Sequence, residues 1–252
     1  MEIEYPKIEQ LPQLRQLWKL AFGDTEDFMD GFYGSGFSPE RCRCMAAGED
    51  MAAMLYWFDC ECQGRRLAYI YGVATHPGYR NRGLCRKLMA DTEAVLREQG
   101  YWGAILVPQH MPLRKMYASM DYGDAGTVSY VNCVASEGPV SLRKITAKEY
   151  AALRRAFLPG GSVLQEGASL PFLERIYELY AGPDFLLAAF REEGFLWGME
   201  LLGNKEAAPG ILKALGCVKG RFRTPGKDQP FAMYLPLTET AEKPAYFGLA
   251  FD

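Results

Sequence analysis

The chain has 252 residues, a length that suits two modest domains better than a single core. Hydrophobic residues make up 49% of it and charged residues 23%, which is typical of a globular protein and excludes a disordered one. Its 28 basic and 31 acidic residues give a net charge of −3, which supplies no general attraction to nucleic acids or anionic membranes. We therefore expect neither a nucleic-acid nor a membrane partner.

The N-terminal segment carries acidic residues and no apolar run, unlike a signal peptide, and no stretch reaches membrane-spanning length. These features predict a cytoplasmic protein, in which the seven cysteines are reduced. Cys42 with Cys44 and Cys60 with Cys62 form two C-x-C pairs, but both pairs lie in strand-like runs. Because zinc ligands usually come as C-x2-C in tight turns, we expect no metal site.

Apolar spacing, capping residues and glycine turns predict the elements of the first half. In chain order these are helices over residues 8–22 and about 25–32, two strands within 41–62, a strand over 67–75, a helix over 82–99, a strand over 102–108, a helix over 112–120 and a strand over 127–134. A strand–helix–strand passage inside a mainly antiparallel run indicates a mixed α/β sheet with helices on both faces.

The second half repeats this order of elements without a repeat at residue level. Its expected elements are a helix capped by Thr146 and Glu149 that runs to Phe157, a helix over 170–180, strands over 185–190 and 195–203, a helix over 206–216 and strands near 218–223 and 231–236. We therefore predict two α/β domains with mixed sheets, residues 1–137 and 138–252. The apolar end of the chain is expected to be buried.

Residues 70–89 carry the clearest chemical signal, because a buried strand runs through a Pro-Gly turn and a basic loop into a helix. Backbone N–H groups at a helix start have no intrahelical partner, and the helix dipole makes that end positive. Together they suit phosphate oxygens, and Gly83 would let a pyrophosphate approach the backbone closely. The alternative is a solvated basic loop before an ordinary helix.

The run from Arg80 to Cys85 is similar to the Q/R-x-x-G-x-G/A signature of the GNAT acyltransferases, and the preceding VATHPGY resembles their strand and V-x-P turn. The segment from Arg114 to Gly123 is similar to their second motif. The resemblance covers residues 1–135; Cys85 replaces a Gly or Ala, and Asp121-Tyr122 replaces Gly-Phe. The two halves and the aromatic end most resemble the Eis-type acetyltransferases, without their third domain. The resemblance thus implies a GNAT fold followed by a second, degenerate GNAT-like domain.

The resemblance also implies an enzyme with acetyl-CoA as donor, which passes an acetyl or short acyl group to a primary amine by direct attack in a ternary complex. The cofactor-binding residues that it implies are Val73, Ala74 and Thr75 for the pantetheine arm, and Arg80, Asn81, Arg82, Gly83, Leu84 and Cys85 for the pyrophosphate.

Amide formation also needs an acid for the leaving thiolate and a base for the amine. Tyr117 matches the family's acid, although its ring also fits the apolar stripe of its helix. The base is open, because the strand before the loop lacks the carboxylate that many GNAT enzymes use there. His110 or the weaker His76 could serve, and the resemblance to Eis-type enzymes, whose C-terminal carboxylate reaches the active site, adds the chain end at Asp252. We expect removal of Phe251 and Asp252 to cut turnover.

The resemblance places the acceptor beside Phe28, Phe32 and Trp57, although each of these rings would also suit a core. The second half has no comparable signature, since residues 203–210 contain no arginine. We therefore expect no second CoA site there, and a second half that covers the acceptor pocket.

Two other functions are considered. The chain could be a non-catalytic acyl-CoA-binding or scaffold protein, or a tandem-GNAT transferase that uses aminoacyl-tRNA, although the latter should carry a basic face. The expected partner is a small-molecule or peptide amine. A homo-oligomer is compatible with the sequence, which does not fix the oligomeric state.

Overall fold

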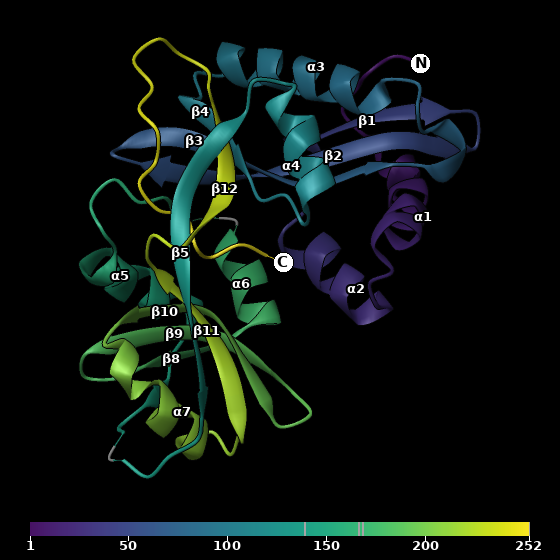
Figure 1. Ribbon diagram of the computed structural model, residues 1–252. Coiled ribbons are helices and arrows are strands. Elements are labelled where there is room, and N and C mark those ends of the chain that lie inside the picture. The colour runs from purple at the N-terminus through teal and green to yellow at the C-terminus, as the bar shows by residue number, and fades with distance from the viewer. Residues whose placement is uncertain (139, 166, 168, 252) are drawn as a thin grey trace.

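The structure, a computed structural model, describes residues 1–138, 140–165, 167 and 169–251, which form one mixed sheet with helices on its faces (Figure 1). The helices are α1 (Leu11–Phe22), α2 (Glu26–Ser35), α3 (Leu84–Glu98), α4 (Met111–Ala118), α5 (Ala147–Phe157), α6 (Ser169–Ile176) and α7 (Ala208–Ala214). The strands are β1 (Cys42–Ala47), β2 (Asp50–Cys62), β3 (Arg65–Thr75), β4 (Gly103–Leu106), β5 (Gly123–Val134), β6 (Arg143–Lys144), β7 (Leu164–Gln165), β8 (Glu178–Ala181), β9 (Phe185–Glu192), β10 (Phe195–Gly203), β11 (Lys219–Pro225) and β12 (Gln229–Pro236).

The strand order is β1-β2-β3-β4-β12-β5-β11-β10-β9-β8-β6, and β7 pairs with β2. Two neighbouring pairs are parallel, β3 with β4 and β10 with β11, and each is joined through a helix, α3 or α7. The other pairs are antiparallel. The predicted mixed α/β fold and the repeated order of elements are therefore confirmed. No helix in the described chain is long and apolar enough to span a membrane.

The two halves exchange strands across the middle of the sheet. β12 returns from the end of the chain and lies between β4 and β5. β5 is shared lengthwise, because residues 123–128 pair with β12 and residues 128–134 pair with β11. The predicted division after residue 137 falls between β5 and β6. That division stays a prediction, but β12 belongs by its hydrogen bonds to the first half of the sheet.

The helix after the basic loop shows how the sequence forms these elements. α3 buries Leu84, Leu88, Met89 and Leu96 on one stripe, at the spacing of an amphipathic helix. The chain then turns at Gly100, whose φ of 76° is in the left-handed region that glycine adopts without strain. With α4, this helix covers one face of the first half of the sheet, while α1 and α2 cover the other (Figure 1).

One predicted boundary is wrong. The helix expected over residues 170–180 ends at Ile176, and Glu178–Ala181 form β8 against β9. Leu179 and Tyr180 enter the cores on opposite faces of the sheet, which is the alternation of a strand and not the stripe of a helix. The composition of this segment suits either a helix or a strand, and pairing with β9 therefore decided that it forms a strand.

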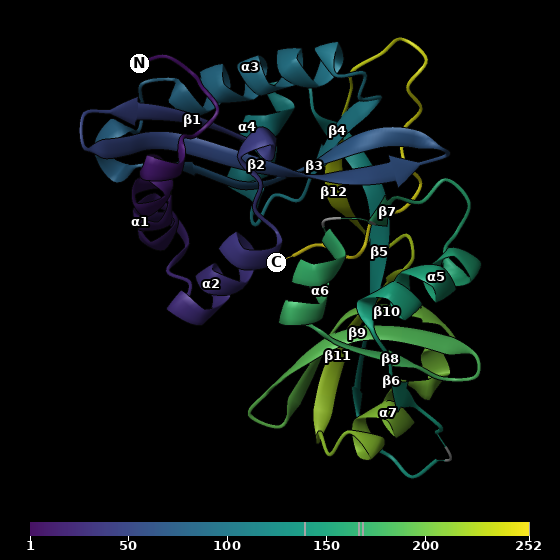
Figure 2. The same ribbon diagram turned by 180° about the vertical axis from the view of Figure 1, so that it is seen from behind.

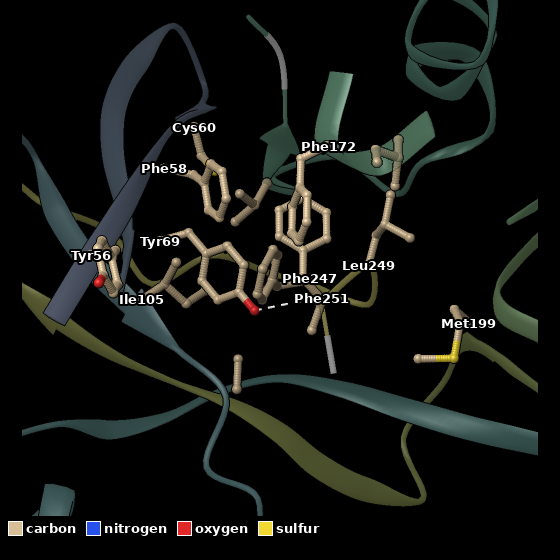
Figure 3. Packing of buried hydrophobic residues seen from close by; sticks show 14 of the residues in the cluster. Tyr56, Phe58, Cys60, Tyr69, Ile105, Phe172, Met199, Phe247, Leu249 and Phe251 are labelled. Carbon is tan, nitrogen blue, oxygen red and sulfur yellow. Dashed lines mark hydrogen bonds between the residues drawn. The ribbon is translucent and has the colours of Figure 1, made fainter. Parts of the chain in front are cut away.

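The end of the chain is buried, as predicted. Residues 246, 247 and 249–251 are each at most 5% exposed. Phe251 packs against Phe58, Tyr69 and Phe172, and lies beside α6 (Figures 2 and 3). Four successive backbone groups of this tail bond to side chains, in the pairs Arg223 Nη1 to Gly248 O (2.9 Å), Gln165 Nε2 to Leu249 O, Tyr177 Oη to Ala250 O (2.7 Å) and Phe251 N to Tyr69 Oη (3.2 Å).

A buried ion pair anchors α5 to β10 in the second half. Arg154 Nε and Nη2 donate to Glu200 at 2.6 and 2.8 Å, and Tyr150 Oη donates to the same carboxylate at 2.9 Å. The two charged side chains are 2% and 0% exposed. Three hydrogen bonds to one carboxylate offset the free-energy cost of taking these two charges out of water. Loss of one partner would therefore leave an unpaired buried charge.

We predict that Glu200→Ala lowers the free energy of unfolding by about 3–5 kcal/mol, measured by urea denaturation, because Arg154 is left buried without its carboxylate. The double variant Arg154→Met with Glu200→Leu should recover most of the loss. Glu137→Ala, which breaks the exposed pair with Lys213, is the control and should cause no measurable loss. A loss for Glu200→Ala no larger than that of the control would contradict the prediction.

Candidate active site

The site begins where two parallel strands separate. β3 and β4 pair over three positions, from Leu67 opposite Gly103 to Tyr69 opposite Ile105. Beyond this point the two strands continue without pairing with each other. The edge of β3 that faces β4 is therefore left open at its carboxyl end. Unpaired strand edges offer a row of backbone donors and acceptors to any extended ligand.

A bulge in β3 lies at the same place. Tyr71 pairs with Tyr56 and Ala74 with Met54, so Gly72 and Val73 together face a single residue of β2. Gly72 has a φ of 58°, and a Cβ on it would lie 2.8 Å from Tyr56 and 2.9 Å from Trp18. Only glycine fits both the backbone and the space. The bulge bends β3 away from a regular course and re-aims the residues that follow.

A cavity of about 540 Å³ occupies the opening. Its walls come from both halves of the chain. The contributing segments are residues 69–73 of β3, Leu106 at the end of β4 and residues 107–109 after it, Trp18 and Phe22 of α1, Asp24 and Thr25 before α2, Asp27 and Phe28 of α2, Leu113 and Tyr117 of α4, Arg175 and Ile176 of α6, Tyr177, Phe190 of β9 and Phe251. Most of these side chains are aromatic or aliphatic, as expected of a small-molecule site.

Tyr117, which the sequence predicts as the acid, is one of four described tyrosines at the cavity, together with Tyr69, Tyr71 and Tyr177. It lines the cavity and is 6% exposed, and its hydroxyl has no hydrogen bond within the described residues. Burial, followed by the nearby Cys85 thiol, raises the pKa of Tyr117 above that of an ordinary phenol. The phenol is therefore protonated at neutral pH and can act as a proton donor.

The basic loop has the conformation that an anion site needs. Asn81 and Gly83 have φ values of 61° and 72°, and Gly83 is the N-cap of α3. The first N–H groups of α3 have no intrahelical acceptor and point out of the helix start. A Cβ on Gly83 would meet nothing within 4 Å, so the space before the helix is open. Burial raises the pKa of the Cys85 thiol to about 11, which keeps it uncharged beside this helix start.

Arginines tie the loop to its surroundings. Arg80 Nε donates to Thr75 O at 3.3 Å, and Arg82 donates to Gly78 O at 3.0 Å. Arg86 donates to both the carbonyl and the hydroxyl of Ser119 at 2.8 and 2.7 Å, which links the start of α3 to the end of α4. The loop and Tyr117 are thus held in one rigid arrangement.

Two of the three predicted acceptor residues do not line the cavity. Phe28 does, but Phe32 lies in the core behind Trp18, with ring centroids 4.6 Å apart. Trp57 faces the opposite side of the sheet, where its Nε1 donates to Tyr101 Oη at 3.2 Å. Side chains alternate between the two faces along a strand. Tyr56 and Phe58 therefore point to the face of the sheet that α1 and α2 cover, and Trp57 points to the face that α3 covers.

The histidines and the chain end also differ in position from the expectation. His110 does not end β4 but is the N-cap of α4, where its Nδ1 accepts from Leu113 N at 3.3 Å. His76 caps the Pro-Gly turn in the same way, accepting from Gly78 N at 3.2 Å. Neither lines the cavity. Asp252 lies outside the described residues.

Several cavity residues were not expected from the sequence. Trp18 fits an ordinary apolar stripe, and its Nε1 donates to Asp24 at 2.8 Å. Arg175 pairs with Asp27 at 2.5 Å, and Phe190 comes from a strand of the second half. No local signal in the sequence marks Arg175 or Phe190, because only the folded chain brings these two residues to the cavity. Within the described residues no group of three or more His, Cys, Asp or Glu could hold a metal ion.

The comparisons agree with this geometry. Residues 2–125 match the family model described as acetyltransferase (GNAT) domain. No curated protein matches the sequence. Similar solved structures include a GCN5-related N-acetyltransferase from Kribbella flavida, with 18% identity, a TM-score of 0.68 and coverage of 92% of this chain and 70% of that one.

Two further structures show the same fold. Eis1 from Mycobacterium abscessus has 12% identity and a TM-score of 0.65, over 94% of this chain and 74% of that one. A tandem GNAT protein from the clavulanic acid biosynthesis pathway has 13% identity and a TM-score of 0.59, over 95% and 99%. Both alignments extend over the two halves of this chain, so the similarity in fold is not confined to the first half.

We predict that saturating acetyl-CoA raises the melting temperature of the wild type and fails to do so for Gly83→Trp, whose indole would fill the open space before α3. A ligand at about a hundred times its dissociation constant adds about 2.7 kcal/mol of stability. Gly83→Ala is the matched control, because it carries the same backbone strain without the bulk and should keep the shift. Equal shifts in all three proteins would refute the loop as the cofactor site.

Proposed function

Because residues 2–125 form a domain of the GNAT acetyltransferase family, we propose that the protein is an N-acyltransferase that moves an acetyl or short acyl group from acyl-CoA to a primary amine. The observation that carries this proposal is the position of Tyr117 in the wall of the cavity between the separated ends of β3 and β4. The acceptor would be the amine of a small molecule or a peptide.

The donor would lie along the open edge of β3. Backbone groups of Val73, Ala74 and Thr75 continue this edge beyond the last pair with β4. A pantetheine arm contains two amides, which can add to such an edge as a further strand does. The pyrophosphate would then meet the N–H groups at the start of α3, where Gly83 leaves the backbone accessible. These contacts position the thioester and supply no rate by themselves.

The reaction needs one bond formed and one broken. The amine nitrogen attacks the thioester carbonyl, a C–N bond forms, and the C–S bond breaks as the tetrahedral intermediate collapses. The departing thiolate takes the phenolic proton of Tyr117, which is in place at neutral pH because burial raises the pKa of this phenol. The amine gives up its proton to solvent, because the described carboxylates at the cavity, Asp24 and Asp27, already bond to Trp18 and Arg175. The phenolate of Tyr117 then regains a proton from solvent, which completes the cycle.

The second half would close the acceptor side. Arg175, Phe190 and the tail residue Phe251 all line the cavity that Tyr117 faces. Exclusion of water strengthens electrostatic interactions at the reacting atoms and prevents hydrolysis of the thioester. This placement supports a covering role for the second half.

We predict that Tyr117→Phe lowers kcat roughly a hundredfold, the effect typical of losing a general acid, while the dissociation constant of acetyl-CoA is unchanged. Free thiol release and the mass of the acylated amine measure turnover across a panel of amines. Tyr101→Phe is the control, since Tyr101 is equally buried but bonds to Trp57 away from the cavity. An unchanged kcat for Tyr117→Phe would remove the acid from the mechanism.

The same assay separates this function from its rival. If acetyl-CoA stabilises the wild type but no amine in the panel releases thiol, the proposal fails and a non-catalytic acyl-CoA-binding protein is favoured.

A further inference from the structure

A second cavity lies on the sheet of the second half, beside a row of basic residues. Lys219, Arg221 and Arg223 alternate along β11, so they share one face of the sheet. The intervening Phe222 packs on the other face, in the core beneath α7. The basic row therefore faces the side opposite α7.

Each cation of this row lies over an aromatic ring. The distances to the ring centroids are 5.8 Å from Lys219 to Phe195, 3.9 Å from Arg221 to Tyr130 and 4.1 Å from Arg223 to Phe231. Stacking of a guanidinium on a ring fixes its plane and leaves the N–H groups at its edge free to bind. The rings thus pre-orient the donors.

The cavity has a volume of about 390 Å³ and is lined by Arg221 and Arg223 with Tyr130, Phe190, Glu192 and Trp197. Nε of Arg221 is shielded and has no hydrogen-bond partner, and its terminal nitrogens form no hydrogen bond or salt bridge within the described residues. A shielded donor of a charged group without an acceptor is costly. The terminal nitrogens are not shielded in this way, so an anion in this cavity would meet them.

An aromatic row connects this cavity to the proposed active site. Phe190, Trp197 and Arg221 lie opposite one another on three neighbouring strands. The rings of Tyr177 and Phe190 stack at 6.4 Å, and those of Phe190 and Trp197 stack at 6.3 Å. Phe190 lines both cavities, and Tyr177 lines the first. A ligand that passes over Phe190 would therefore reach from Tyr117 toward Arg221.

We propose that this second cavity is a subsite for the acceptor, in which Arg221 binds a carboxylate at the end of the molecule remote from the reacting amine. The inference rests on the proposed acyl transfer and names its substrate class, an amine that also carries a carboxylate, such as a short peptide. The planar guanidinium matches the two oxygens of a carboxylate. Of the two arginines that line the cavity, Arg223 donates to Gly248 O, whereas Arg221 has no hydrogen bond within the described residues and is available to the carboxylate.

The first test compares the pentapeptide Gly-Gly-Gly-Gly-Leu with its C-terminal amide as acceptors, because five extended residues span about 17 Å and can pass from the first cavity over Phe190 to Arg221. We expect kcat/KM of the wild type to favour the acid by about tenfold or more, in the range given by charged hydrogen bonds. Arg221→Gln should make kcat/KM equal for the two acceptors. Arg65→Gln, at the exposed start of β3, is the matched control and should keep the preference. Equal values for acid and amide in the wild type would overturn the subsite.

A binding measurement gives a readout that does not depend on turnover. Trp197 is the half-buried tryptophan of the second cavity, Trp18 lines the first cavity, and Trp57 and Trp102 line neither. We expect the pentapeptide acid to change the tryptophan fluorescence of the wild type more than its amide does. This difference between acid and amide should vanish in Trp197→Phe and in Arg221→Gln.

The two readouts separate the subsite from the proposed function. If the acid binds at Trp197 but no acceptor takes up an acetyl group, the transfer reaction is refuted and the subsite stands. If acetyl transfer occurs but acid and amide bind and react alike, the subsite is refuted and the transfer reaction stands. Because the comparison of acid with amide uses the unaltered protein, it does not depend on the folding of any variant.

Discussion

The hydrogen bonds between β3 and β4 stop after Tyr69 and Ile105, and the proposed chemistry depends on this separation. An open strand edge usually invites pairing with another chain. Here the edge lies inside the molecule, between α1, α4 and the tail, so only a ligand can use it. The bulge at Gly72 lies just beyond the last pair of β3 with β4, and the space that a side chain would need there is taken by Trp18 and Tyr56. A backbone bulge, a cavity and the proposed proton donor thus lie together at one place in the fold.

The second half completes the first and is more than an appended copy. β12 provides the neighbour that β4 and β5 require, and the tail that follows it carries Phe251 to the cavity wall. Side chains from both halves hold that tail, among them Tyr69 from the first (Figure 3) and Tyr177 from the second. The second half repeats the order of elements without a basic loop, since residues 203–210 contain no arginine. Its own sheet face instead carries the aromatic and basic row that ends at Arg221.

Local signals in the sequence correctly predicted the features that depend on residues close together in the chain. The loop at Gly83, the stripe of α3 and the placement of Tyr117 on a short helix were all predicted correctly, because capping, periodicity and motif spacing act within a few residues. Trp57 and His110 were misplaced because the face parity of a strand and the capping role of a side chain are settled only when the register is known. Phe190 could not have been predicted, since it reaches the cavity only through strand exchange between the halves.

Amide hydrogen exchange with and without acetyl-CoA tests the central claim most directly, because it reports the backbone groups to which the donor binds. The account predicts that the ligand slows exchange at residues 72–75 and 81–86, the open edge of β3 and the start of α3. Exchange at residues 203–210, the corresponding stretch of the second half, should not change. Slowed exchange confined to that second stretch, or no change at either, would contradict the assignment of the opening between β3 and β4 as the donor site.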